Sequence, residues 1–145
     1  MNGEPVVILL VEDDPGHAKL VQRNLESSRL ANRLIHVADG QAALDYLYHL
    51  AEFSNLELSL RPGVILLDLQ LPKVDGLNVL ETIKSDPDLS RIPVVVLTTS
   101  ASEADVAKAY DKHVNSYLVK PVDFSKFKDL MESFGYYWLV WNKLP

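Results

Sequence analysis

The sequence contains no cysteine among its 145 residues. This absence excludes disulfide bonds and thiol chemistry, and it fits a reducing compartment such as the cytoplasm. No stretch reaches the roughly 20 consecutive apolar residues of a membrane helix, so we expect no contact with a membrane. The opening MNGEPVVILLVEDD lacks the positively charged region of a secretory signal. We therefore expect a cytoplasmic protein.

Basic residues are also scarce. The chain has 14 Lys and Arg against 20 Asp and Glu, which gives a formal net charge of −6. Nucleic-acid surfaces usually carry clustered Lys and Arg, so this balance argues against a nucleic-acid partner. It favours a cation or a basic protein partner instead. The length is most simply that of one domain over residues 1–145.

Short apolar runs alternate with helical patterns along the chain. Runs rich in Val and Ile, whose composition and length favour strands, occur at residues 5–11, 34–38, 64–69, 93–99 and 116–120. Amphipathic patterns typical of helices follow at residues 17–27, 39–50, 76–86, 102–112 and 123–134. The alternation predicts an α/β fold with a parallel sheet covered on both faces. Residues 51–63 are expected to form a surface loop, with a partner contact as the alternative.

Polar residues lie where the predicted strands end. Glu12 and Asp13 follow the first run, and Asp68 lies at the end of the third. Thr98 and Lys120 lie at the ends of the fourth and fifth. In the common strand order 2-1-3-4-5, ligands bind at the carboxyl edge between the first and third strands. We therefore expect the three carboxylates to meet in a cleft at that edge.

This set of groups suits phosphoryl transfer. Three carboxylates in one cleft repel one another unless a cation joins them, and Mg²⁺ commonly binds one or two carboxylates with phosphate oxygens. Lys120 offers a compact positive charge and Thr98 a hydroxyl for holding anionic oxygens. Asp68 is then a carboxylate nucleophile that forms an aspartyl phosphate.

The motifs LLVEDD, VILLDLQLPKVDG, VVVLTTS and YLVKP closely resemble the receiver domain of two-component response regulators. The resemblance covers about residues 5–134, and the long loop and aromatic tail further resemble the single-domain, phytochrome-associated regulators. It implies a flavodoxin-like (βα)5 three-layer sandwich with sheet order 2-1-3-4-5. It also implies Mg²⁺ as cofactor, a sensor histidine kinase of the phytochrome type as phosphodonor, and a downstream protein or phosphotransfer protein of a phosphorelay as target.

The resemblance assigns roles to single residues. Asp68 would be the phosphoacceptor, and Thr98 and Lys120 would hold the phosphoryl oxygens. Tyr117 would be an aromatic switch that moves with Thr98 and changes the face formed by the fourth helix, fifth strand and fifth helix. The peptide bond before Pro121 would be cis. The domain would assist only its own phosphorylation and dephosphorylation, so it is not an enzyme with ordinary turnover.

The resemblance also assigns metal ligands. Asp13 and Asp68 would bind Mg²⁺ directly, Glu12 would act through water, and Gln70 would supply its backbone carbonyl. The side chain of Gln70 and the hydroxyl of Ser100 are candidates for steering the water that hydrolyses the phosphoryl group. We further expect His17, near the cleft mouth, to be an exposed residue, with contact to a docking partner as the alternative.

The last twelve residues hold five of the twelve aromatic side chains. A continuous helical stripe is formed by Phe124, Phe127, Met131, Phe134, Trp138 and Trp141. Its first half is expected to pack on the sheet. Tyr137, Trp138 and Trp141 are predicted to lie beyond the core in an extension over residues 135–145 that forms a homodimer contact.

Three other interpretations remain. A docking scaffold would keep the fold without being phosphorylated. A phosphatase of the haloacid-dehalogenase type would need a second carboxylate two residues after its nucleophile, where this chain has Gln70. A nucleotide-binding domain would need a glycine-rich turn after the first strand, where only Gly16 occurs.

Overall fold

A computed structural model describes residues 6–27, 32–135 and 137–138 of the chain. Strands and helices alternate in the order β1 (Val6–Val11), α1 (Pro15–Glu26), β2 (Asn32–Val37), α2 (Gly40–Leu47), β3 (Val64–Leu67), α3 (Gly76–Ser85), β4 (Val94–Thr98), α4 (Glu103–Asp111), β5 (Ser116–Val119) and α5 (Phe124–Gly135). Two short 3-10 turns, η1 (Ala51–Phe53) and η2 (Leu89–Arg91), lie in the connections before β3 and β4. All strands are parallel in the order β2-β1-β3-β4-β5, so the predicted fold and sheet order are confirmed.

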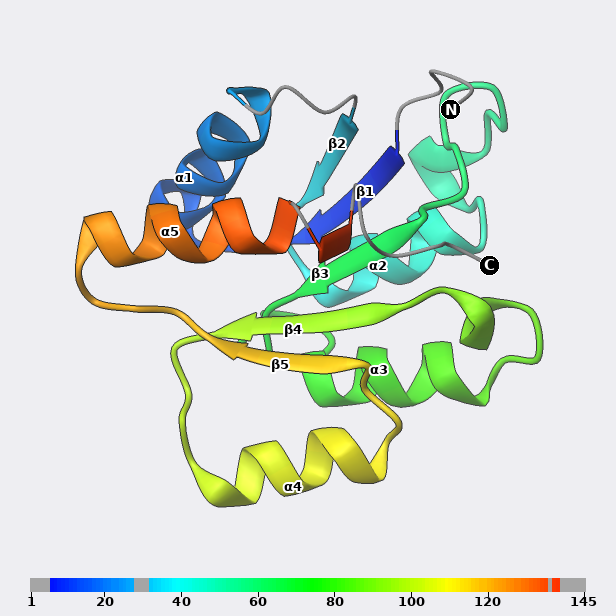
Figure 1. Cartoon of the computed structure of the whole chain (residues 1–145). Helices are drawn as coiled ribbons and strands as arrows, with labels where there is room; N and C mark the ends of the chain where they lie inside the picture. The colour runs from blue at the N-terminus through cyan, green and yellow to red at the C-terminus, as the bar shows by residue number, and fades with distance from the viewer. Residues whose placement is uncertain (1–5, 28–31, 136, 139–145) are drawn as a thin grey trace.

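The sheet is buried on both faces because its central strands β1, β3 and β4 are apolar at every position except Thr98. Leu9 of β1 faces one apolar cluster, which α2, α3 and α4 cover. The neighbouring Leu10 faces a second cluster, which α1 and α5 cover. Alternate side chains of a strand point to opposite faces, so one continuous run such as VVILLV builds two cores at once. Helices therefore form the outer layers of a three-layer sandwich (Figure 1).

Helix starts are fixed by side chains that accept hydrogen bonds from free backbone N–H groups. Asp14, Asp39, Asp75 and Ser102 cap the helices α1, α2, α3 and α4 in this way. Pro15 opens α1, as its fixed φ angle and missing N–H group suit the first helical turn. These caps fix where each of the four helices begins.

Some element boundaries differ from the predictions. The β2 strand begins at Asn32 instead of residue 34, because this edge strand tolerates polar residues such as Arg33 that interrupt an apolar run. The β3 strand ends at Leu67, so Asp68 follows the strand instead of lying within it. The Lys120–Pro121 peptide bond is trans, so the expected cis bond is wrong here. The two isomers of such a bond differ by only about 0.5–1 kcal/mol, so sequence alone does not fix the choice.

The tail also differs from the prediction. Trp138 is 7% exposed and belongs to the apolar cluster under α1 and α5, where its ring lies 6.5 Å from that of Phe134. It therefore completes the chain's own core instead of lying beyond it. Tyr137 is 54% exposed. Trp141 lies outside the described residues.

Candidate functional site

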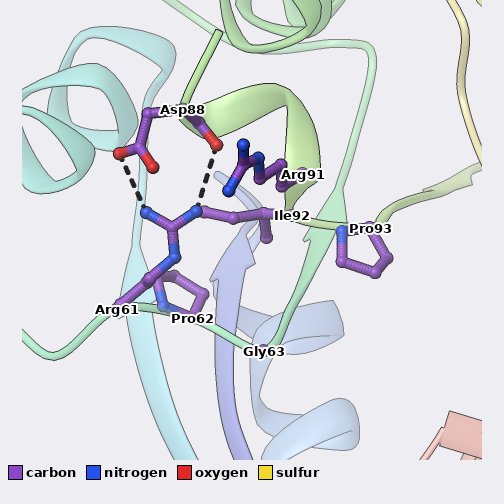
Figure 2. A pocket seen from close by; sticks show the side chains of 7 residues that line it. All are labelled: Arg61, Pro62, Gly63, Asp88, Arg91, Ile92 and Pro93. Carbon is purple, nitrogen blue, oxygen red and sulfur yellow. Dashed lines mark hydrogen bonds and ion pairs between the residues drawn. The ribbon is translucent and has the colours of Figure 1, made fainter. Parts of the chain in front are cut away.

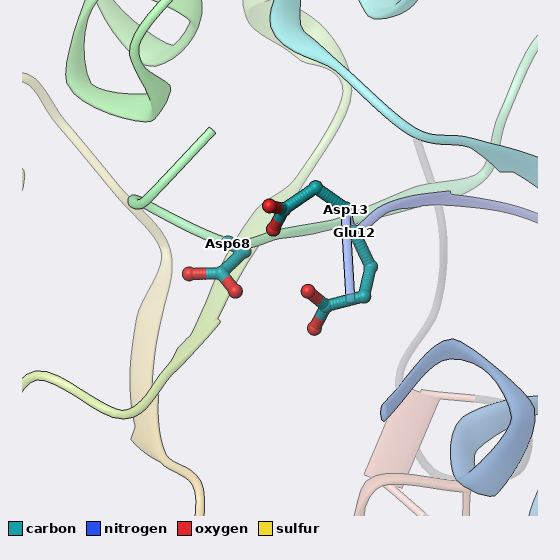
Figure 3. A group of neighbouring side chains, drawn as sticks. All are labelled: Glu12, Asp13 and Asp68. Carbon is teal, nitrogen blue, oxygen red and sulfur yellow. The ribbon is translucent and has the colours of Figure 1, made fainter. Parts of the chain in front are cut away.

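The carboxyl edge of the sheet carries the predicted polar residues. Backbone hydrogen bonds hold them in register, because Asp68 N donates to Val11 O (3.0 Å) and Lys120 N donates to Thr98 O (2.7 Å). The first of these bonds brings Asp68 beside the residues that follow β1. Figure 3 shows the three side chains gathered there, Glu12, Asp13 and Asp68. Sequence position alone thus predicted the convergence correctly.

Asp68 is held by donors on both carboxylate oxygens. Thr98 Oγ1 donates to Oδ1 at 2.9 Å, and the backbone N–H of Gln70 donates to the same atom at 3.1 Å. Lys120 Nζ donates to Oδ2 at 2.9 Å. Burial raises the pKa of this carboxyl, but the Lys120 ammonium and the other donors outweigh it, so the pKa lies below its ordinary value. Asp68 is therefore ionised at neutral pH.

Lys120 joins two carboxylates inside the protein. Its side chain is only 2% exposed, and its ammonium also donates to Glu12 Oε1. Burial of Glu12 raises the pKa of that carboxyl to about 7, although its bond to Lys120 lowers it; the charge of Asp68 adds to the rise. Two buried carboxylates thus share a single cation, which leaves the site rich in negative charge.

The acidic group fits a hard divalent cation. Glu12, Asp13 and Asp68 each offer one carboxylate oxygen, and these oxygens lie within 4.8 Å of one another. Mg²⁺ prefers such oxygen ligands and neutralises carboxylates that would otherwise repel. Asp13 is exposed, whereas Glu12 and Asp68 are buried, so the group opens to solvent on one side. These residues could therefore hold Mg²⁺ together with water.

Tyr117 lies next to the site on β5. It is half-buried against the core, and its hydroxyl donates to the backbone carbonyl of Ser100 at 2.8 Å. The hydroxyl of Ser100 donates to Asp105 Oδ2 at 2.5 Å. The loop between β4 and α4 is thus tied to β5 on one side and to α4 on the other. The Ser100 hydroxyl is engaged with α4.

The side chain of Gln70 lies at the outer margin of the site. It is exposed, and its Oε1 lies 3.5 Å from Thr99 Oγ1, a long distance for a hydrogen bond. Only the backbone N–H of Gln70 contacts Asp68. The side chain therefore makes no short hydrogen bond to the described residues of the site.

His17 makes a contact that the sequence pattern did not predict. Its Nδ1 lies 3.0 Å from Lys120 Nζ, across 103 positions of the chain. Position near the cleft mouth was the available signal, but a partner so distant in sequence cannot be read from local pattern. His17 is thus part of the site and not an exposed residue without a contact there.

The profile of the response regulator receiver domain matches residues 8–132. The chain belongs to this family. The matched span contains the sheet except for Val6 and Val7, and it contains every residue of the site described above.

Relatives of the receiver domain match over nearly the whole chain. The probable methanogenesis regulatory protein FilR2 of Methanothrix harundinacea is 49% identical over 142 residues, which cover 98% of this chain and 89% of that protein. Response regulator Rcp1 of Synechocystis sp. is 47% identical over 141 residues, covering 97% and 94%. The latter and this chain therefore have similar lengths.

Two solved structures share the receiver fold closely. The Mn²⁺-bound form of Rcp1 has a TM-score of 0.92 at 47% identity and covers 97% of this chain and 99% of its own. The phosphorylated cyanobacterial phytochrome response regulator RcpA has a TM-score of 0.92 at 42% identity, with the same coverage. Similar proteins thus include one with a bound metal ion and one with a phosphoryl group.

Other hollows of the receiver domain lie away from this site. A cavity of about 400 Å³ surrounds the ion pair of Arg61 and Asp88 (Figure 2). It is lined by Gly63 and Pro93, which precede β3 and β4, so it lies at the amino edge of the sheet.

No helix among the described residues is long and apolar enough to cross a membrane.

Proposed function

We propose that the chain acts as a response regulator whose Asp68 accepts a phosphoryl group. The observation that carries this proposal is the state of the Asp68 carboxylate. It is ionised, and it accepts hydrogen bonds of 2.9 Å from both Thr98 and Lys120 beside the other two acidic residues, Glu12 and Asp13. A carboxylate in this state needs no general base to act as a nucleophile. The site therefore supports phosphoryl transfer to the protein itself.

The residues of the site divide the work of this transfer. A carboxylate oxygen of Asp68 forms a bond to phosphorus, while the bond to the donor breaks and its electron pair leaves with the donor group. Thr98 and Lys120 are placed to hold phosphoryl oxygens as the new charge arrives. Glu12, Asp13, Asp68 and the backbone carbonyl of Gln70 would hold Mg²⁺, which supplies neutralising charge at the phosphoryl oxygens.

A sensor histidine kinase is the proposed phosphodonor, and the cytoplasm is the proposed location. A phytochrome-type kinase is favoured because RcpA, at 42% identity, is described as a phytochrome response regulator. FilR2, at 49% identity, bears the name of a methanogenesis regulator. We therefore propose a histidine kinase as the phosphodonor, and a phytochrome-type kinase is the first candidate to test.

Phosphorylation would signal through the face formed by α4, β5 and α5. Thr98 bonds Asp68 directly, and Tyr117 bonds the loop that begins just after Thr98. A phosphoryl group on Asp68 would take over the Thr98 hydroxyl and change the loop that holds Tyr117. A downstream protein or a phosphotransfer protein would then read the altered face.

The same face is proposed as a homodimer contact. Among the described residues, β5 pairs with β4 alone and lies at the edge of the sheet, and a cavity of about 330 Å³ lies beside it between Leu118 and Tyr137. Tyr137 is exposed there, and Trp141 continues the chain. Exposed apolar surface of this kind marks interfaces. A strictly monomeric mass at high micromolar concentration would refute this part of the proposal.

Lifetime of the phosphoryl group is proposed to depend on the Gln70 side chain. Gln70 is exposed, and among the described residues its side chain makes only the long contact of 3.5 Å with Thr99. The Ser100 hydroxyl would contribute only after leaving Asp105. Dephosphorylation rates of Gln70→Ala and Ser100→Ala that equal that of the wild type would count against both roles.

Intact-mass analysis after incubation with acetyl phosphate and Mg²⁺ tests the proposed function. We expect the gain of one phosphoryl group in the wild type, and none in Asp68→Asn or in a sample stripped of metal with a chelator. Circular dichroism of Asp68→Asn verifies that this variant is folded. No gain in the wild type would favour the docking scaffold, in which the receiver fold binds partners without chemistry.

A further inference from the structure

The ammonium of Lys120 has a hydrogen-bond acceptor for each of its three hydrogens. Two acceptors are carboxylate oxygens, of Glu12 and Asp68. The third is His17 Nδ1 at 3.0 Å. Since the Lys120 side chain is 2% exposed, these three groups fix the direction of the ammonium with little help from water. Of these three acceptors, His17 is the one that is not a carboxylate.

The hydrogen bond with Lys120 determines which nitrogen of the His17 ring carries the proton. A lysine ammonium has only donors, so the Nδ1 atom that faces it must present a lone pair. The ring proton then lies on Nε2. Carboxylate oxygens of Asp14 and Glu12 lie 3.8 Å and 3.9 Å from Nδ1, beyond hydrogen-bonding distance. Lys120 is therefore the hydrogen-bond partner of this nitrogen.

Two further contacts orient His17. Its backbone N–H donates to Asp14 Oδ1 at 3.1 Å, within the cap that begins α1. Its ring lies 6.4 Å from that of Phe127, a buried residue of α5. The imidazole is thus held between the first turn of α1 and the core side of α5. This placement gives Lys120 an anchor outside the acidic group.

We propose that His17 is a positioning residue. It keeps the Lys120 ammonium directed at the phosphoryl site while a divalent cation takes over the carboxylate oxygens of Glu12 and Asp68. The inference rests on the proposed function. A divalent cation bound by Glu12 and Asp68 competes for the oxygens that now hold the ammonium. The His17 nitrogen is a poor ligand for such a hard cation, so its bond to Lys120 persists. Lys120 then keeps one fixed hydrogen bond and turns the other two hydrogens toward incoming oxygens.

Phosphorylation rates of matched variants test this role. His17→Ala removes the acceptor, and we expect phosphorylation by acetyl phosphate to slow by about threefold to tenfold, the effect of one hydrogen bond. His17→Asn places an amide oxygen near the former Nδ1 and should restore most of the rate. Gln22→Ala, at a half-buried position of the same helix, is the control and should match the wild type. Equal rates for His17→Ala and the wild type would overturn the inference.

The protonation state of the His17 ring gives a second measurement that needs no phosphoryl transfer. Long-range proton–nitrogen NMR of the wild type at neutral pH should show the proton on Nε2. A proton on Nδ1 would overturn the inference whatever the rates are. Failure of the wild type to take up a phosphoryl group would instead refute the proposed function, and the ring tautomer would still decide whether His17 anchors Lys120.

Discussion

Replacing Lys120 by methionine tests the charge balance of the site most severely. The substitution keeps much of the side-chain volume but removes the cation shared by Glu12 and Asp68. Breaking a buried ion pair from one side typically costs about 3–5 kcal/mol, because the remaining charge is left without compensation. At pH 7.5 without metal, we expect Lys120→Met to lower the free energy of unfolding by this amount.

Mg²⁺ should recover part of that loss. A dication bound by the acidic group replaces the missing charge, and a ligand at 100 times its dissociation constant stabilises the folded state by about 2.7 kcal/mol. The wild type should gain less, because Lys120 competes with the metal for the same two carboxylates. Saturating Mg²⁺ should therefore narrow the gap between variant and wild type.

Urea denaturation, followed by far-UV circular dichroism with and without Mg²⁺, measures both effects. Lys112→Met is the matched control, because Lys112 pairs with the exposed Glu81 at 3.0 Å on the surface. Surface pairs of this kind contribute about 0–1 kcal/mol. The reasoning would be refuted if Lys120→Met cost no more than Lys112→Met, or if Mg²⁺ stabilised variant and wild type equally.

Two further predictions concern backbone fit and pH. A Cβ atom at Gly76 would lie 2.4 Å from Asp68 O, so Gly76→Ala should lower the free energy of unfolding by at least about 2 kcal/mol in urea titrations. A Cβ atom at Gly135, the last residue of α5, would meet nothing within 4 Å, so Gly135→Ala should raise the free energy of unfolding by about 0.4–1 kcal/mol. A loss in Gly135→Ala equal to that in Gly76→Ala would contradict the fit. The pKa of Glu12 rises from 4.5 to about 7 on folding, so the folded state binds more protons than the unfolded state in that range. Metal-free stability should therefore fall by about 3 kcal/mol as pH rises from 4.5 to 7, and Glu12→Gln should flatten this slope relative to wild type. An unchanged slope in Glu12→Gln would assign the effect to other groups.

Much of the fold follows from local pattern. Continuous apolar runs such as VVILLV specify strands buried on both faces, and the helices between them force parallel order. Polar residues after these runs then meet at one edge of the sheet, which is why the sequence alone predicts that Asp68 and Lys120 lie together. The start of the edge strand β2 could not be predicted from the apolar pattern, because Arg33 breaks the apolar run.

Contacts between distant segments could not be read from pattern. The bond between His17 and Lys120 depends on how the first turn of α1 meets the end of β5. Burial of Trp138 depends on how far α5 reaches across the sheet, which its helical stripe does not reveal. Both features arise from packing among elements, where single-sequence periodicity carries no information on partners.

The most direct test of the central claim identifies the phosphorylated residue itself. Reduction of the acetyl phosphate-treated protein with borohydride converts an aspartyl phosphate into homoserine, which peptide mass analysis then locates. We predict homoserine at position 68 in the Mg²⁺-containing sample, and unmodified Asp68 in the metal-free sample. Homoserine at Asp13, or a stable phosphoryl group on any hydroxyl side chain with Asp68 unmodified, would contradict the account.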